Sequence, residues 1–174
     1  VSKAHSMDLK LVMDMIFNHI GSGHWWMKDL PSNDWVHQFI NFTRTNYRAS
    51  TYMDPYAAKS DADLMEKGWF DNTMPDLNQS NPLVETYLTQ NSLWWIAYFG
   101  IDGIRMDTYP YPEKSMMSRW AKRITDEFPG FFIGDPFSPS RHHIFFRVGI
   151  GIHSFSVDSD IRYPPEAVLC QVRL

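Results

Sequence analysis

Three short apolar segments, each followed by polar or charged residues, most constrain the fold of this chain. They cover residues 10–17, 101–106 and 131–134, and their length and β-rich composition are typical of buried strands. Amphipathic helical patterns over residues 82–99 and 113–128 separate them. Strands that alternate with helices imply right-handed crossovers, so the sequence predicts an α/β fold with a parallel sheet.

The long segment after the first predicted strand has no helical or strand periodicity. It covers residues 20–80, which is far longer than an ordinary loop, and we therefore expect a small inserted subdomain. Four of the seven tryptophans lie in it: Trp25, Trp26, Trp35 and Trp69. Sugar faces stack on such rings, but tryptophan is equally a core residue, so this cluster alone leaves both interpretations open.

Composition excludes several classes of protein. With 174 residues, 44% of them hydrophobic, the chain can bury a real core, and a net charge of −4 offers no basic surface for nucleic acid. No apolar run predicts a membrane span. Residues 1–5 contain neither an initiating methionine nor a signal-peptide core, so we expect the middle of a longer protein. Cys170 is the only cysteine, which excludes an internal disulfide but does not fix the compartment.

Chemistry-bearing side chains gather where the three predicted strands end. The carboxyl ends of parallel strands meet at one edge, and in a β/α barrel the active site lies there. We therefore expect these side chains to converge. They are Asp14, Asn18, His19, Arg105, Asp107 and Asp135.

Asp107 and Asp135 are the carboxylates on this pattern that could act as a catalytic pair. Retaining glycosidases need two carboxyl groups about 5 to 5.5 Å apart, a separation that neighbouring strand ends can supply. Arg105 lies two residues before Asp107, so both side chains point to one face, where a guanidinium would orient the carboxylate. A structural ion pair explains the same spacing equally well. Asp14 could be a second partner of Arg105 or a paired core residue.

Asn18 and His19 are weaker signals when taken alone. The amide oxygen of Asn18 could bind a hard cation together with carbonyl groups of the insertion. A single histidine such as His19 is more often structural than functional.

Three motifs in this order resemble those of the α-amylase superfamily, glycoside hydrolase family 13. Residues 14–19, Asp-Met-Ile-Phe-Asn-His, resemble its first conserved region at the end of the third barrel strand, and residues 103–107, Gly-Ile-Arg-Met-Asp, resemble its second, after the fourth. Residues 74–78, Met-Pro-Asp-Leu-Asn, resemble the motif that marks the neopullulanase and oligo-1,6-glucosidase branches. The resemblance covers residues 1–135. It implies a partial TIM (β/α)8 barrel, about strands 3 to 5, with 20–80 as the inserted domain B.

The resemblance also implies roles for individual residues. Asp107 would be the nucleophile and Arg105 its orienting partner, which Asp14 supports. His19 would donate a hydrogen bond to the sugar, and Asn18 is a calcium ligand in many relatives. Calcium is the one cofactor that the family implies. The implied partners are starch, maltooligosaccharides or pullulan, in which mainly α-1,4 bonds would be cleaved.

Finer features are most similar to the neopullulanase-type enzymes of gut Bacteroides. They are residues 24–31, 68–70 and 107–111. By this likeness Tyr109 and Trp69 would bind substrate, and a periplasmic or secreted location would be usual for such a protein.

The chain departs from the family pattern at two places. Asp135 follows Ile-Gly where the family has Glu as the general acid, and a carboxyl group displaced by about an angstrom can cost about 100-fold in rate. Residues 136–174 do not resemble the family's next helix. We therefore expect an incomplete barrel that folds poorly alone and hydrolyses slowly. Two alternatives stay open: a transglycosylase or isomerase of the same superfamily, and a non-catalytic binding subunit.

Overall fold

The computed structural model describes most of the chain as two compact units. The described residues are 1–52, 54–135, 144–145 and 167–171. One unit comprises residues 1–15, 89–107 and the described residues from 119 onward; the other comprises residues 16–88 and 108–118.

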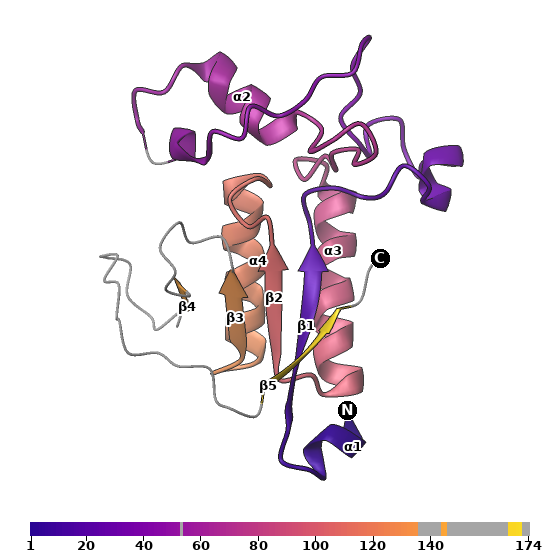
Figure 1. Cartoon of the computed structure of the whole chain (residues 1–174), viewed down its shortest axis with the longest axis vertical. Helices are drawn as coiled ribbons and strands as arrows, with labels where there is room; N and C mark the ends of the chain where they lie inside the picture. Colours follow the sequence, from indigo (N-terminus) through magenta and orange to yellow (C-terminus); the bar gives the residue numbers. More distant parts are fainter. Residues whose placement is uncertain (53, 136–143, 146–166, 172–174) are drawn as a thin grey trace. The chain divides into compact units, whose positions relative to one another are not determined.

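A five-stranded sheet lies in the first unit. Its strands are β1 (Lys10–Ile16), β2 (Gly103–Asp107), β3 (Phe132–Asp135), β4 (Ile144–Phe145) and β5 (Ala167–Gln171). The order is β4-β3-β2-β1-β5; β2 is parallel to β3, β1 is parallel to β5, and β4 is antiparallel to β3. Figure 1 shows β1, β2 and β3 pointing the same way. The predicted parallel arrangement of these three strands is confirmed, whereas β4 and β5 were not predicted.

Four α-helices and three shorter helical segments accompany the sheet. They are α1 (Ser2–His5), η1 (Trp25–Lys28), η2 (Ala49–Tyr52), α2 (Lys59–Lys67), α3 (Pro82–Trp94), η3 (Trp95–Phe99) and α4 (Lys114–Glu127). The side chain of Asn81 caps α3 by accepting a hydrogen bond from the Leu83 amide at 2.8 Å. Gly100 ends this helix in the left-handed region, with a φ of 66°. The predicted stop at Gly100 is therefore confirmed, but the last turn, η3, is a π-helix.

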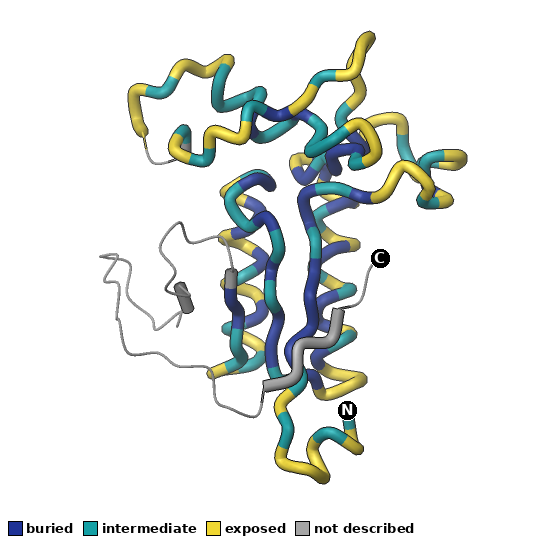
Figure 2. Tube along the Cα trace, in the orientation of Figure 1, coloured by how far each residue is buried: buried dark blue, intermediate teal, exposed yellow. Residues whose placement is uncertain are grey.

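The core of the first unit joins α3, α4 and the sheet through one buried serine. Trp120 is fully buried, and its indole N–H donates to the Ser92 hydroxyl at 3.0 Å. Ser92 in turn lies 3.5 Å from the sulfur of Met15. Since a buried indole N–H without a partner would be costly, this contact lets a tryptophan occupy the core. Figure 2 shows that β1 and β2 are mostly buried.

The start of β2 is tied to β1 by Asp102. One carboxylate oxygen accepts the Leu11 amide and contacts His5, both at 2.8 Å, and the other contacts Lys10 at 3.2 Å. The predicted strand began at Ile101, but β2 begins at Gly103. The reason is that the Asp102 side chain takes the Leu11 amide, which would otherwise serve the strand ladder.

The glycines of β2 and β3 make room for one aromatic ring. A Cβ atom at Gly103 would lie 2.5 Å from Cδ1 of Phe132, and one at Gly134 would lie 2.8 Å from Cζ of the same ring. Both distances are far below van der Waals contact, so a larger residue at either place would displace the ring. Gly103, which belongs to one of the motifs above, therefore has a packing role.

The second unit contains the insertion and has its own aromatic core. Trp26 and Trp35 are buried, with ring centroids 5.3 Å apart, and Trp26 also contacts Tyr87 at 5.0 Å. By contrast, Trp25 is 64% exposed. Two of the four clustered tryptophans are thus core residues, which reduces the weight of composition as evidence for a sugar site. Among the described residues, no helix is both long and apolar enough to span a bilayer.

Candidate functional site

Arg105 joins two carboxylates at the carboxyl end of the sheet. One guanidinium nitrogen lies 2.5 Å from Oδ1 of Asp14 on β1, and another lies 3.0 Å from Oδ1 of Asp107 on β2. The Asp14 side chain is 4% exposed, whereas those of Arg105 and Asp107 are 23% and 22% exposed. The structure thus brings together three predicted site residues, with Asp14 buried beneath and Asp107 open to a ligand.

Asp135 ends the neighbouring strand β3. The register pairs Arg105 with Gly134, so Asp135 follows at the carboxyl edge where Asp107 ends β2. Its side chain lies outside the part of the chain that the structure describes. The backbone placement is what a second carboxylate on an adjacent strand requires.

The residue after Asp107 holds an unfavourable backbone conformation. Thr108 has a φ of 53° and is 2% exposed, although β-branched residues rarely occupy the left-handed region. Such strain clusters at functional sites, where the surrounding fold holds it in place. Sequence analysis gave no signal for it. Tyr109, predicted to bind substrate, lies in the turn that follows and is half-buried.

In the second unit, the end of the first predicted strand pairs with the Met-Pro-Asp-Leu-Asn motif. The Leu77 amide donates to the Asn18 carbonyl at 2.9 Å, and the Ile20 amide donates to Pro75 at 3.1 Å. The Gln79 side chain donates to the Phe17 carbonyl at 2.9 Å. The motif therefore fixes the backbone around Asn18, which explains why the two stretches occur together.

His19 is held by an aromatic group of the insertion. Its ring stacks on Phe70, with centroids 5.1 Å apart and an interplanar angle of 22°. Phe70 in turn contacts Tyr47 at 5.4 Å and Tyr111 at 5.3 Å. Burial lowers the pKa of His19 to about 4, so the ring is neutral near pH 7. Phe70 is a site residue that sequence analysis had noted without assigning it a role.

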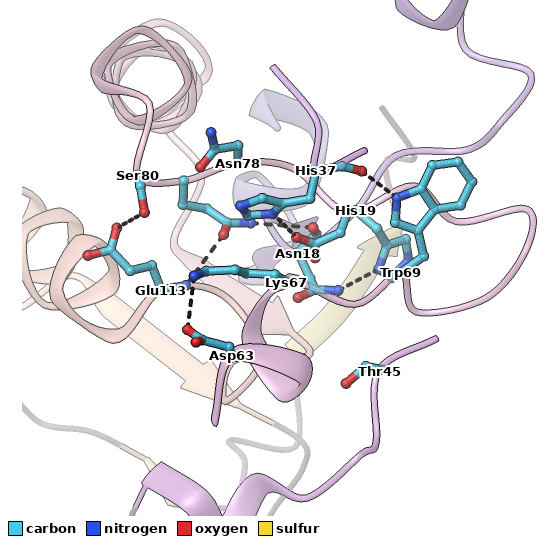
Figure 3. A network of polar contacts seen from close by, with 12 residues as sticks. Asn18, His19, His37, Thr45, Asp63, Lys67, Trp69, Asn78, Ser80 and Glu113 are labelled. Atoms are coloured by element: carbon cyan, nitrogen blue, oxygen red, sulfur yellow. Dashed lines mark hydrogen bonds and ion pairs between the residues drawn. The ribbon is translucent and has the colours of Figure 1, made fainter. Parts of the chain in front are cut away.

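Trp69 is positioned by its indole nitrogen. The N–H donates to the His37 carbonyl at 2.6 Å, as Figure 3 shows, and the ring meets Phe42 edge to face at 6.2 Å. With its polar atom used by the backbone, Trp69 can offer a sugar only its apolar ring.

Asp76 is the most buried acid of the second unit. Its Oδ2 lies 2.7 Å from Nδ1 of His37. Burial raises the pKa of Asp76 well above its usual range, with Glu66 adding to the shift, and burial together with Lys67 lowers the pKa of His37 to about 4. The pair therefore shares a hydrogen bond between largely neutral groups rather than a full ion pair.

Two buried oxygens on these paired segments suit a hard cation. Oδ1 of Asn18 and Oδ1 of Asp76 have no hydrogen-bond partner, and the bridge between His19 and Asp76 holds their segments side by side. Within the described residues, no group of three or more His, Cys, Asp or Glu could hold a metal. Calcium, however, also accepts amide and backbone oxygens, so the residues present fit it. Sequence analysis had proposed Asn18 but had not assigned Asp76.

Parallel strands that end in an arginine-held carboxylate, with an insertion after the first of them, define a β/α enzyme of the sugar-cleaving class. Residues 1–147 match the family Alpha-amylase, described as the alpha amylase catalytic domain, and the chain belongs to this family. The resemblance stated from the motifs is thus confirmed at the level of the family. The expected division at residue 135 stays a prediction, because residues 136–143 and 146–166 lie outside the described part.

Known relatives and solved structures agree with this assignment. The chain is 30% identical to the intracellular maltogenic amylase of Bacillus subtilis over 141 residues, which cover 76% of this chain and 21% of the relative. It is 26% identical to the trehalose synthase/amylase TreS of Mycobacterium tuberculosis, over 75% of this chain and 25% of the relative. The α-amylase of Geobacillus thermoleovorans, solved with acarbose, superposes with a TM-score of 0.60 at 33% identity, over 76% of this chain and 26% of that one. The chain thus spans about a quarter of the length of each.

Proposed function

We propose that this chain carries part of the catalytic centre of a retaining glycoside hydrolase that cleaves α-glucosidic bonds, mainly α-1,4, in starch, maltooligosaccharides or pullulan. The observation that carries the proposal is Arg105, which holds the buried Asp14 and the more exposed Asp107 at once. One guanidinium thereby fixes the direction of a carboxylate that stays open to a ligand. Membership of the α-amylase family supplies the α-glucan substrate class.

In this mechanism Asp107 attacks the anomeric carbon while Asp135 protonates the departing glycosidic oxygen. A covalent glycosyl-aspartate forms, and water activated by Asp135 then hydrolyses it, which retains the anomeric configuration. The neutral ring of His19 donates a hydrogen bond to a sugar hydroxyl. Tyr109 and Trp69 contribute apolar surface to the sugar.

Replacing Asp135 by Glu is expected to raise the rate of maltooligosaccharide hydrolysis by about 100-fold. The added methylene would carry the carboxyl group the missing angstrom toward the glycosidic oxygen. The measurement is kcat/KM of the complete gene product against that of the variant, with Asp126→Glu on the exposed face of α4 as the matched control. An unchanged rate would mean that Asp135 is not the general acid.

The finer specificity is also a proposal. The neopullulanase-type features around residues 24–31 and 107–111 suggest cleavage of pullulan, whose release of panose chromatography would detect. The likeness to a trehalose synthase/amylase favours isomerisation as the second candidate. The same nucleophile serves both reactions, which differ in whether water or a sugar hydroxyl accepts the glycosyl group. Incubation with maltose separates them, because hydrolysis yields glucose and isomerisation yields trehalose.

We further propose that Asn18 and Asp76 hold a calcium ion, which would keep the buried Asp76 ionised. At a free concentration of 100 times Kd, calcium is expected to stabilise the fold by about 2.7 kcal/mol, which raises Tm by about 5 to 10 °C. EDTA should reverse the shift, and Asp76→Asn should abolish it. Asp71→Asn, at an exposed acid of the same segment, is the control. A Tm that is indifferent to calcium and EDTA would refute the site.

A further inference from the structure

The side chain of Asn18 presents two different ends to two different environments. Its amide nitrogen lies 3.2 Å from Nδ1 of His19, a contact drawn in Figure 3, while its amide oxygen has no partner. The residue is 1% exposed, and its carbonyl is fixed by the Leu77 amide and the Gln79 side chain. The backbone therefore cannot move to exchange the two ends; only a flip of the amide group can.

The orientation of this amide decides which nitrogen of His19 carries the proton. An NH₂ group only donates, so Nδ1 must accept and the single proton of the neutral ring must be on Nε2. If the amide were flipped, its oxygen would accept from Nδ1–H, and Nε2 could then accept but not donate. Stacking on Phe70 holds the plane of the imidazole ring, so the ring cannot compensate by rotating freely.

We propose that Asn18 is a positioning residue that keeps His19 in the Nε2–H form, and that a cation at the Asn18 oxygen locks the amide in this orientation. A cation attracts the amide oxygen and repels the NH₂ group, so the flipped state becomes unfavourable. This inference rests on the proposed function, in which His19 donates a hydrogen bond to the substrate.

The test is the ¹⁵N spectrum of the histidine rings in the complete gene product, with His19 assigned by its loss in His19→Gln. With calcium present, we expect Nδ1 to resonate as an unprotonated nitrogen and Nε2 as a protonated one. Removal of calcium with EDTA is expected to reveal a fraction of the other tautomer. A ring protonated at Nδ1 in the calcium-loaded protein would overturn the proposal, as would a tautomer ratio that EDTA leaves unchanged.

The variant Asn18→Asp separates the two ends of the side chain, because it keeps an oxygen for the cation and removes the NH₂ donor. Its carboxylate would accept from Nδ1–H, so we expect the tautomer to reverse and kcat/KM for maltooligosaccharides to fall about tenfold, the loss of one hydrogen bond. Asn78→Asp is the matched control, since Asn78 has a buried oxygen of the same kind but no contact with His19. It should leave the tautomer unchanged.

The outcomes distinguish this inference from the proposed function. If Asp107→Asn abolishes hydrolysis while Asn18→Asp changes neither the tautomer nor kcat/KM, the proposed function stands and the role of Asn18 is refuted. If the tautomer reverses as expected but the protein cleaves no α-glucan, Asn18 positions His19 and the proposed function fails.

Discussion

Replacing Asp107 by Asn is expected to lower kcat for maltooligosaccharide hydrolysis by about 10⁴-fold, an effect typical of the loss of a catalytic nucleophile. Asn has the same shape, and its oxygen can still accept the hydrogen bond from Arg105, which lies 3.0 Å away. The fold and sugar binding should therefore persist. The measurement is kcat of the complete gene product, with the circular dichroism spectrum and Kd for an oligosaccharide as controls.

A chemical test shows whether Asp107 is the nucleophile or only part of an ion pair. In Asp107→Ala the space vacated by the carboxylate admits azide, which can attack the anomeric carbon from the same face and expel the leaving sugar. We expect sodium azide to restore turnover and to yield a glycosyl azide of inverted configuration. No azide product, together with an Asn variant that keeps the native rate, would remove Asp107 from the mechanism.

Replacing Arg105 by Met is expected to lower the free energy of unfolding by about 3 to 5 kcal/mol, the cost of leaving a buried carboxylate without its cation. Asp14 is the group at risk, because its side chain is 4% exposed, and the contact with Arg105 is the ion pair recorded for it. Asp107, at 22% exposure, can still be hydrated. Urea denaturation gives the change in free energy directly.

Two controls make this prediction specific. In Arg123→Met, an exposed ion pair between neighbouring turns of α4 is lost, so a change below about 0.5 kcal/mol is expected. The double variant Arg105→Met with Asp14→Leu removes the stranded carboxylate and should recover most of the lost stability. If the double variant were as unstable as Arg105→Met alone, the loss would come from packing rather than from the unpaired charge.

The local pattern of the sequence predicted the elements of the sheet unit and the group around Arg105. Period-two alternation placed Arg105 and Asp107 on one face, and the common polarity of parallel strands brought Asp14 to the same edge, where the structure has it. These rules act within single elements and between adjacent strands, so they needed no knowledge of the insertion.

The second unit was beyond such rules. The partner of His19 is Phe70, and that of Asp76 is His37, each separated from it by long aperiodic chain. No periodicity fixes the path of a segment whose pairing consists of isolated bridges, so its contacts depend on tertiary packing. The motif that contains Asp76 was visible in the sequence; its burial against His37 was not.

The ring of Phe132 has a consequence for how this region can change in evolution. Because Gly103 and Gly134 both give their Cβ space to that ring, the three positions form one unit of sequence variation. A relative with a side chain at either glycine must carry a smaller residue at the position of Phe132, and the two changes must be inherited together. Gly103 lies two residues before Arg105, so such a drift would pass next to the catalytic strand end and would be tolerated only as a pair.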